Sequence, residues 1–191
     1  MAVPKILAFA GSLREKSFNK QLVKIAAESA RKAGADVNYI DLRDYPLPVF
    51  DEDLEKAEGL PANARKLKDL FIGADGLLIS APEYNSSITA ALKNTIDWVS
   101  RPVPDEPPLA GFAGKVAAIM SASPGELGGL RGLVHVRAIL GNIQTLVLPD
   151  QVSVPRAAEA FNPDGTLKDG RKQASVEKLG EKLTIILGRL Q

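Results

Sequence analysis

The chain has 191 residues, 45% hydrophobic and 25% charged, which predicts one globular domain over residues 1–191. Its 24 basic and 23 acidic residues give a net charge of +1, which excludes the strongly basic surface of a protein that binds nucleic acid or an anionic membrane. With no cysteine and one histidine, thiol chemistry is excluded and no metal site is expected. The apolar run ending at Ala10 is too short to span a membrane and lacks a signal peptide's layout, so we expect a cytoplasmic protein.

The predicted elements alternate between short apolar strands and amphipathic helices. In chain order we expect a strand at 6–10, a helix from 17 to about 33, a strand at 37–42, a helix at 61–71, a strand at 76–81, a helix at 88–99, a strand at 116–120, a helix at 130–140, a strand at 145–148 and a helix at 167–190. Gly180 somewhat breaks the periodicity of the last helical segment. The segments 45–58, 101–108 and 150–164 are predicted to be loops.

This alternation predicts an α/β fold, a flavodoxin-like three-layer sandwich. Its five-stranded parallel sheet has the order 2-1-3-4-5, with helices on both faces. In such a sheet ligands bind beyond the carboxyl ends of the strands, where the strand order reverses. We therefore expect a binding site built from the loops 11–19, 82–87 and 121–129, all of which are polar or rich in glycine.

The first of these loops carries anion-binding groups just before a helix. Ser12, Ser17 and Asn19 offer neutral donors and Arg14 a charge-assisted fork, beside the partial positive charge of a helix N-terminus. The alternative is that Ser17 caps the helix and Arg14 is solvated. Because the loop matches neither the Walker A motif nor G-x-G-x-x-G, it indicates a mononucleotide phosphate rather than ATP hydrolysis or a dinucleotide.

The second and third loops have the residues to line a flat heterocycle. Pro82 stiffens the chain as it leaves the sheet, and the residues that follow offer hydrogen bonds and an aromatic surface, namely Glu83, Tyr84, Asn85 and Ser87. The stretch from Ser121 to Gly129 is small enough for its backbone to approach a ligand. The alternatives are a polar loop in which Ser86 or Ser87 caps the next helix, and a simple flexible turn.

Together these motifs resemble those of the NADPH-dependent FMN reductase family. The resemblance rests on Gly11-Ser-Leu-Arg14 with Ser17 and Asn19, on Pro82-Glu-Tyr-Asn85 with Ser87, and on Leu92-Lys-Asn-Thr-Ile-Asp-Trp98. The stretch from Gly125 to Arg131 is also similar to the chromate and quinone reductase branch of that family. The resemblance runs from about residue 5 to about residue 150 and is not diagnostic beyond Asp150.

The resemblance implies a protein that binds FMN and assembles as a homodimer or homotetramer. Ser12, Arg14, Ser17 and Asn19 would hold the phosphate, Pro82, Glu83, Tyr84, Asn85 and Ser87 would line the ring and ribityl chain, and Ser121, Ser123 and Gly125 would close the other side. The helix carrying Ile96 and Trp98 would pack near the subunit contact. Pro124 departs from the expected turn and removes one backbone donor.

The implied activity is transfer of hydride from NAD(P)H to FMN and then to an acceptor such as a quinone, chromate, an azo compound or a ferric chelate. The cofactor carries this chemistry, so no side chain is assigned a catalytic role, and His135 is interpreted as structural. One alternative is that FMN is a diffusible substrate supplied to a monooxygenase. Another is an electron carrier of the flavodoxin type, which Arg14 and the +1 charge disfavour, and a third is an interaction module without a ligand.

Overall fold

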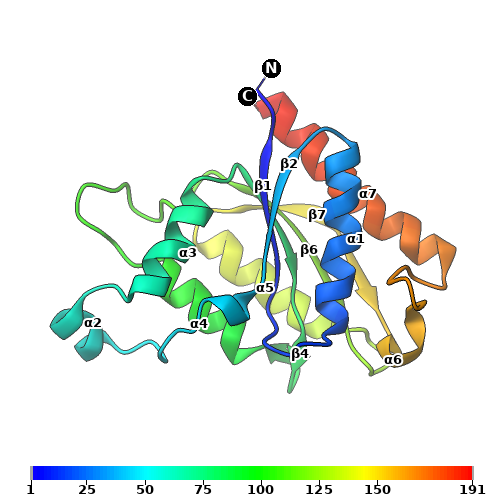
Figure 1. The fold of residues 1–191 in the computed structure, drawn as a ribbon, viewed down its shortest axis with the longest axis horizontal. Helices are drawn as coiled ribbons and strands as arrows, with labels where there is room; N and C mark the ends of the chain where they lie inside the picture. Colours follow the sequence, from blue (N-terminus) through cyan, green and yellow to red (C-terminus); the bar gives the residue numbers. More distant parts are fainter. Residues whose placement is uncertain (1, 191) are drawn as a thin grey trace.

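The computed structural model describes residues 2–190 as a parallel sheet between two layers of helices (Figure 1). The strands of this sheet are β1 (Lys5–Ala10), β2 (Asp36–Ile40), β3 (Gly76–Ser80), β6 (Val116–Ala122) and β7 (Leu146–Val154). They lie in the order β2-β1-β3-β6-β7, and every neighbouring pair is parallel. The predicted flavodoxin-like sandwich is confirmed. Because β4 (Glu83–Tyr84) and β5 (Ser87–Ile88) form a separate hairpin, β6 and β7 are the fourth and fifth strands of the main sheet, and the predicted order 2-1-3-4-5 is also confirmed.

The helices divide between the two faces of the sheet. They are α1 (Phe18–Lys32), α2 (Glu52–Glu58), α3 (Ala62–Ile72), α4 (Ala90–Val99), α5 (Leu130–Asn142), α6 (Ala157–Ala160) and α7 (Gly170–Leu190), with a short 3-10 turn at Leu42–Asp44. Successive residues of β1 point to opposite faces. Ile6 and Ala8 therefore join the core beneath α1 and α7, whereas Leu7 and Phe9 join the core beneath α3, α4 and α5. Burial on both faces explains why this strand is continuously apolar.

The α7 helix is continuous through Gly180, although this residue breaks the helical periodicity of the sequence. Gly180 is buried against α1, and a Cβ atom at this position would lie 2.0 Å from the carbonyl oxygen of Ala26. The glycine lets the two helix backbones approach more closely than any side chain would allow. Neither α7 nor any other helix within residues 2–190 is long and apolar enough to cross a membrane.

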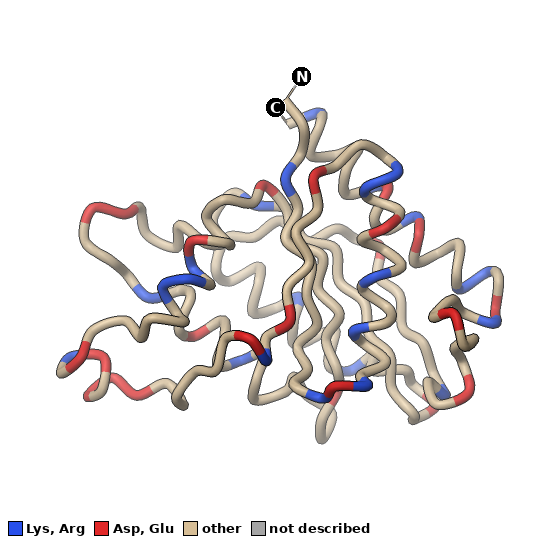
Figure 2. The backbone as a smooth tube through the Cα atoms, viewed as in Figure 1, with Lys and Arg blue, Asp and Glu red and all other residues tan. Residues whose placement is uncertain are grey.

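The segment 45–58, predicted to be a loop, contains the α2 helix. Asp51 caps this helix by accepting a hydrogen bond from the backbone N–H of Asp53 at 2.8 Å. No residue of α2 is buried, and the helix lies at the outer edge of the molecule, where acidic residues gather along it (Figures 1 and 2). The Nε atom of Arg101 holds it by donating to Glu55 Oε1 at 2.8 Å. A helix without an apolar face gives no helical periodicity in the sequence.

The segment 150–164 also differs from the prediction, because β7 continues to Val154 and α6 follows it. The pairing of β7 with β6 shifts between Ala117 and Ile119, which pair with Val147 and Gln151 respectively. The residues between those partners include Pro149, which has no N–H group to contribute to the ladder. The strand resumes beyond this irregularity, so the predicted end at residue 148 is too early.

Candidate functional site

The loops that follow β1, β3 and β6 meet at the carboxyl edge of the sheet, beside the β4–β5 hairpin (Figure 1). They enclose a small cavity of about 50 Å³, termed here the cradle. The cradle is lined by Ser12, Arg14, Ser17, Phe18, Asn19, Pro82, Glu83, Tyr84, Ala122, Ser123 and Pro124. Most of the predicted cofactor-binding residues thus share one cavity. Four of the predicted residues lie outside its lining, namely Asn85, Ser87, Ser121 and Gly125. The lining also includes three residues that were not named as cofactor ligands, namely Phe18, Ala122 and Pro124.

The start of α1 forms the anion-binding wall of the cradle. Ser17 occupies the N-cap position, but its side chain makes no capping hydrogen bond, and the first turn of the helix carries no acidic residue. Arg14 is exposed, and within residues 2–190 its guanidinium donates a single 3.4 Å bond, to the carbonyl of Lys16, and joins no ion pair. A free hydroxyl, an unpaired guanidinium and a helix N-terminus together fit a bound phosphate.

Unlike the other polar residues of this loop, Asn19 uses its side chain mainly to hold strands and a helix together. Its side chain is buried, and Nδ2 donates to the carbonyl of Ala122 at 2.7 Å while Oδ1 accepts from the N–H of Ala122 at 2.9 Å and from Ser80 Oγ at 2.8 Å. The amide therefore joins α1 to the ends of β3 and β6. This leaves one amide N–H of Asn19 for a ligand.

The second loop is a tight hairpin rather than an irregular polar loop. Asn85 and Ser86 connect β4 to β5 with φ angles of 51° and 67°, the left-handed conformation of a two-residue hairpin turn. The following helix begins at Ala90, and Thr89 caps it by accepting from the N–H of Leu92 at 3.1 Å. The alternative in which Ser86 or Ser87 caps this helix is therefore excluded. Ser87 Oγ instead contacts His135 Nδ1 on α5 at 2.8 Å.

Glu83 fixes this hairpin to the start of α5. Its Oε1 atom accepts from both Nε and Nη2 of Arg131 at 3.0 and 2.7 Å, and its Oε2 atom accepts from the N–H of Gly132 at 3.0 Å. Burial of the side chain acts to raise the pKa of Glu83, but the hydrogen bonds from Gly132 and Arg131 outweigh it and lower that pKa. Glu83 therefore orients the hairpin against α5.

Replacing Glu83 with glutamine should weaken the fold at neutral pH but not in acid. Because the folded-state pKa is lowered, the stabilisation by the carboxylate is complete above its ordinary pKa of 4.5 and is lost as the pH falls through the lowered value. We expect Glu83→Gln to reduce the free energy of unfolding by about 1–3 kcal/mol at pH 7. At a pH below the lowered pKa the difference from the wild type should vanish. Urea denaturation at both pH values measures it.

The matched control is Glu126→Gln. Glu126 also forms a bidentate pair with an arginine, Arg156, but both side chains are exposed, so little change in stability is expected at either pH. A loss for Glu83→Gln that persists unchanged in acid would show that the carboxylate charge is not the cause.

The third loop depends on two glycines in the left-handed conformation. Gly128 and Gly129 have φ angles of 61° and 87°, and a Cβ on Gly129 would lie 1.9 Å from Ser121 Oγ. Ser121 is fully buried beneath this glycine, and its hydroxyl has no hydrogen-bond partner within residues 2–190. Ser123 lines the cradle and its N–H donates to the carbonyl of Val154 at 3.1 Å, which joins this loop to the end of β7.

The α4 helix, which is expected to pack near a subunit contact, does not present Ile96 or Trp98 to a second subunit. Both side chains are buried within the protomer, with exposed fractions of 4% and 0%. Trp98 Nε1 donates to the carbonyl of Pro48 at 2.8 Å, and its ring meets the ring of Phe50 edge-on at 5.0 Å. The apolar face of α4 therefore packs against the sheet and the 45–50 segment, so these side chains are not available to a second subunit.

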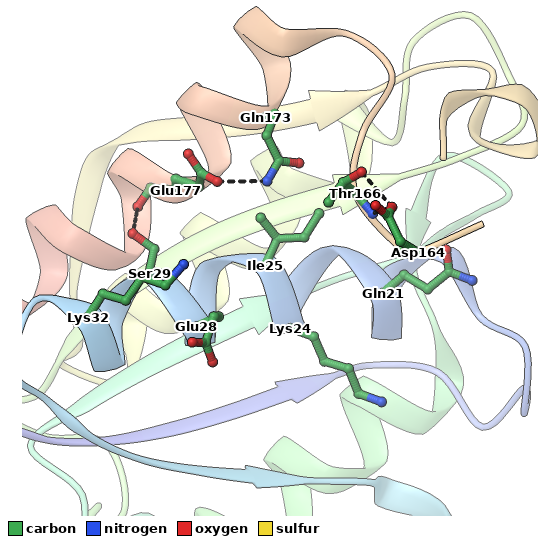
Figure 3. A pocket seen from close by; sticks show the side chains of 11 residues that line it. Gln21, Lys24, Ile25, Glu28, Ser29, Lys32, Asp164, Thr166, Gln173 and Glu177 are labelled. Atoms are coloured by element: carbon green, nitrogen blue, oxygen red, sulfur yellow. Dashed lines mark hydrogen bonds between the residues drawn. The ribbon is translucent and has the colours of Figure 1, made fainter. Parts of the chain in front are cut away.

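A larger cavity lies elsewhere, between α1 and α7, with a volume of about 480 Å³ (Figure 3). Lysines and carboxylates both line it, and several of its polar groups bind one another, as when Ser29 Oγ donates to the carbonyl of Glu177 at 2.7 Å. Because it shares no residue with the cradle and shows no excess of one charge, we do not place the active site there.

Within residues 2–190, no group of three or more His, Cys, Asp or Glu side chains is arranged to hold a metal ion.

Comparison with known proteins places the chain in a family. Residues 4–159 match the NADPH-dependent FMN reductase family. An NAD(P)H-dependent FMN reductase from Pseudomonas aeruginosa is 34% identical over 194 residues, which cover 98% of this chain and 97% of the relative. A quinone reductase from Escherichia coli is 38% identical over 145 residues, which cover 75% of this chain and 73% of the relative.

A solved structure agrees with these matches. The flavoenzyme NAD(P)H:(acceptor) oxidoreductase from Paracoccus denitrificans superimposes with a TM-score of 0.79 at 26% identity, covering 98% of both chains. Sequence similarity over nearly the whole chain and the shared fold lead to one conclusion. This protein is an oxidoreductase that belongs to the NADPH-dependent FMN reductase family.

Proposed function

We propose that the protein binds FMN in the cradle and uses NAD(P)H to reduce a small-molecule acceptor. The observation that carries this proposal is the start of α1, where Ser17 does not cap the helix and Arg14 joins no ion pair within residues 2–190. When bound, FMN supplies the redox chemistry, accepting hydride from NAD(P)H and donating electrons to the acceptor. The side chains bind and orient the reactants, and none is assigned as a catalytic acid or base.

The predicted ligands of FMN divide among the walls of the cradle. Ser12, Arg14 and Ser17 would bind the phosphate, with the remaining N–H of Asn19. Pro82 to Asn85 and Ser87 would contact the ring and ribityl chain, and Ser121, Ser123 and Gly125 would close the opposite side. The Glu83–Arg131 pair would keep the hairpin against α5 so that this wall keeps its shape.

We infer that a quinone is the first acceptor to test. Relatives from Escherichia coli and Arabidopsis thaliana are named quinone reductase and NADPH:quinone oxidoreductase. Tyr84 lines the cradle with 52% of its surface exposed, so its ring offers an aromatic face to a planar molecule arriving from solvent. Chromate, azo compounds and ferric chelates are further candidates.

We also propose that the chain assembles as a homodimer or homotetramer in the cytoplasm. Leu127, Leu130 and Val134 lie along the start of α5 with 47%, 42% and 58% of their surfaces exposed, and exposed apolar side chains of this kind often mark an interface. A chain without cysteine and with NAD(P)H as electron donor suits a reducing compartment. Sedimentation across a range of concentrations tests the assembly, and a monomer throughout would contradict it.

The test of function is the visible spectrum of the purified protein, recorded before and after anaerobic addition of NADPH or NADH. Flavin absorption bands that bleach on mixing would support a bound-flavin reductase, and their rates would rank the two nucleotides. Turnover only with added free FMN would favour FMN as a diffusible substrate. A colourless protein that retains no added FMN and shows no turnover would refute the proposal.

Replacing Arg14 with methionine should weaken FMN binding about 10- to 100-fold, the usual effect of losing a charge-assisted hydrogen bond. Fluorescence quenching of added FMN measures the dissociation constant. Arg31→Met is the control, because Arg31 lies at the far end of α1, the helix that follows Arg14, and its Nη2 atom donates to the carbonyl of Val37 at 2.9 Å. An equal loss of affinity in both variants would place the phosphate away from Arg14.

A further inference from the structure

Two phenylalanine rings lie behind Arg14. The guanidinium carbon of Arg14 lies 5.8 Å from the centroid of the Phe18 ring. That ring stacks on Phe161, with centroids 5.9 Å apart and an angle of 8° between their planes. Phe161 follows α6, far along the chain and beyond the residues 4–159 that match the family. A segment outside the family match therefore reaches back to the anion-binding wall of the cradle.

Phe161 is held firmly by the turn that follows it. It forms an isolated antiparallel bridge with Leu167, and the N–H of Asn162 donates to the carbonyl of Thr166 at 2.8 Å. Leu167 is buried in the core beneath α1 and α7, and the partly buried rings of Phe18 and Phe161 pack against the same core. The stack is thus anchored to the core of the protein.

Little else restricts the side chain of Arg14, because it is exposed and its one hydrogen bond within residues 2–190 is the 3.4 Å bond to the carbonyl of Lys16. A flexible arginine loses rotamer entropy when it binds an anion, and a ring that already orients the guanidinium reduces this loss. We propose that Phe161 is a positioning residue that, through Phe18, holds Arg14 ready for the phosphate of the flavin. This inference rests on the proposed binding of FMN in the cradle.

The test compares FMN with riboflavin, which lacks the phosphate. Phe161→Leu removes the aromatic face but keeps an apolar side chain, and Phe161→Tyr keeps the ring. We expect the leucine variant to bind FMN about 3- to 10-fold more weakly than the wild type, in line with the strength of an aromatic pair. Riboflavin affinity should not change, and the tyrosine variant should bind FMN like the wild type. Phe50→Leu is the matched control, because the ring of Phe50 also lies by an arginine, 5.1 Å from Arg101, outside the cradle lining.

A double-mutant cycle with Arg14→Met decides whether the effect passes through the guanidinium. If Phe161 acts through Arg14, then Phe161→Leu should leave FMN affinity unchanged once Arg14 is already methionine. An equal loss for FMN and riboflavin, or full additivity with Arg14→Met, would overturn the positioning role. A wild-type protein that binds neither flavin would instead refute the proposed function, and the inference with it. Thermal melting of each variant checks that it is folded.

Discussion

Replacing Trp98 with alanine is expected to lower the free energy of unfolding by about 3–5 kcal/mol, the usual cost of truncating a buried tryptophan. Trp98 is fully buried, and its Nε1 atom donates to the carbonyl of Pro48, which also accepts from Asn94 Nδ2 at 2.8 Å. The change would leave a large cavity under α4 and loosen the 45–50 segment that leads to α2. Urea denaturation followed by circular dichroism measures the loss.

Tyr84→Ala is the control, because it removes another large aromatic side chain, close in sequence to α4 but half exposed, and should change stability little. The variant Trp98→Phe separates stability from assembly. It keeps most of the apolar volume, so its mass in solution should equal that of the wild type. A change in assembly with no loss of stability would mean that Trp98 lies at a subunit contact after all.

Replacing Gly180 with alanine is expected to destabilise the protein by about 1–3 kcal/mol or more, the usual range for overpacking. The added Cβ would lie 2.0 Å from the carbonyl oxygen and 3.0 Å from the carbonyl carbon of Ala26, and backbone atoms cannot move aside as a flexible side chain can. The α1 and α7 helices would have to separate. The shift in the midpoint of thermal unfolding measures the effect.

Gly188→Ala provides the control on the same helix. Its added Cβ would have only an ordinary contact, 4.0 Å from Pro4 Cγ, so the better helix propensity of alanine should stabilise the protein by up to about 1 kcal/mol. We therefore expect Gly180→Ala to lower the midpoint of thermal unfolding and Gly188→Ala to raise it. Stabilisation by both would show that α1 and α7 are free to separate at little cost.

The sheet could be predicted from the sequence because its central strands are buried on both faces, and β1, β3 and β6 are continuous apolar runs. The elements that were missed lack such a pattern. The α2 helix has no buried residue, and β7 continues beyond Pro149, which disguises the alternation that follows. The sequence carries one indication of the two-residue turn at Asn85 and Ser86. That indication is Asn85 itself, because asparagine tolerates the left-handed conformation.

The place of the site was predictable for the same topological reason, since parallel strands bring their carboxyl ends to one edge. The roles of single side chains were not. Asn19 and Glu83 are polar residues of the expected loops, yet their polar atoms are largely engaged by Ala122, Ser80, Arg131 and Gly132. A sequence shows which donors and acceptors exist, but only the folded chain shows which of them already have partners.

The close contact of α1 with α7 also constrains the order of events during synthesis. The α1 helix is made early, and its face with Ala26 and Ala30 is covered by α7, which leaves the ribosome more than a hundred residues later. Until then one face of the nascent sheet is covered by α1 but lacks α7. We therefore expect the chain to reach its native packing only after α7 emerges, and an exposed apolar surface before that is where chaperones bind.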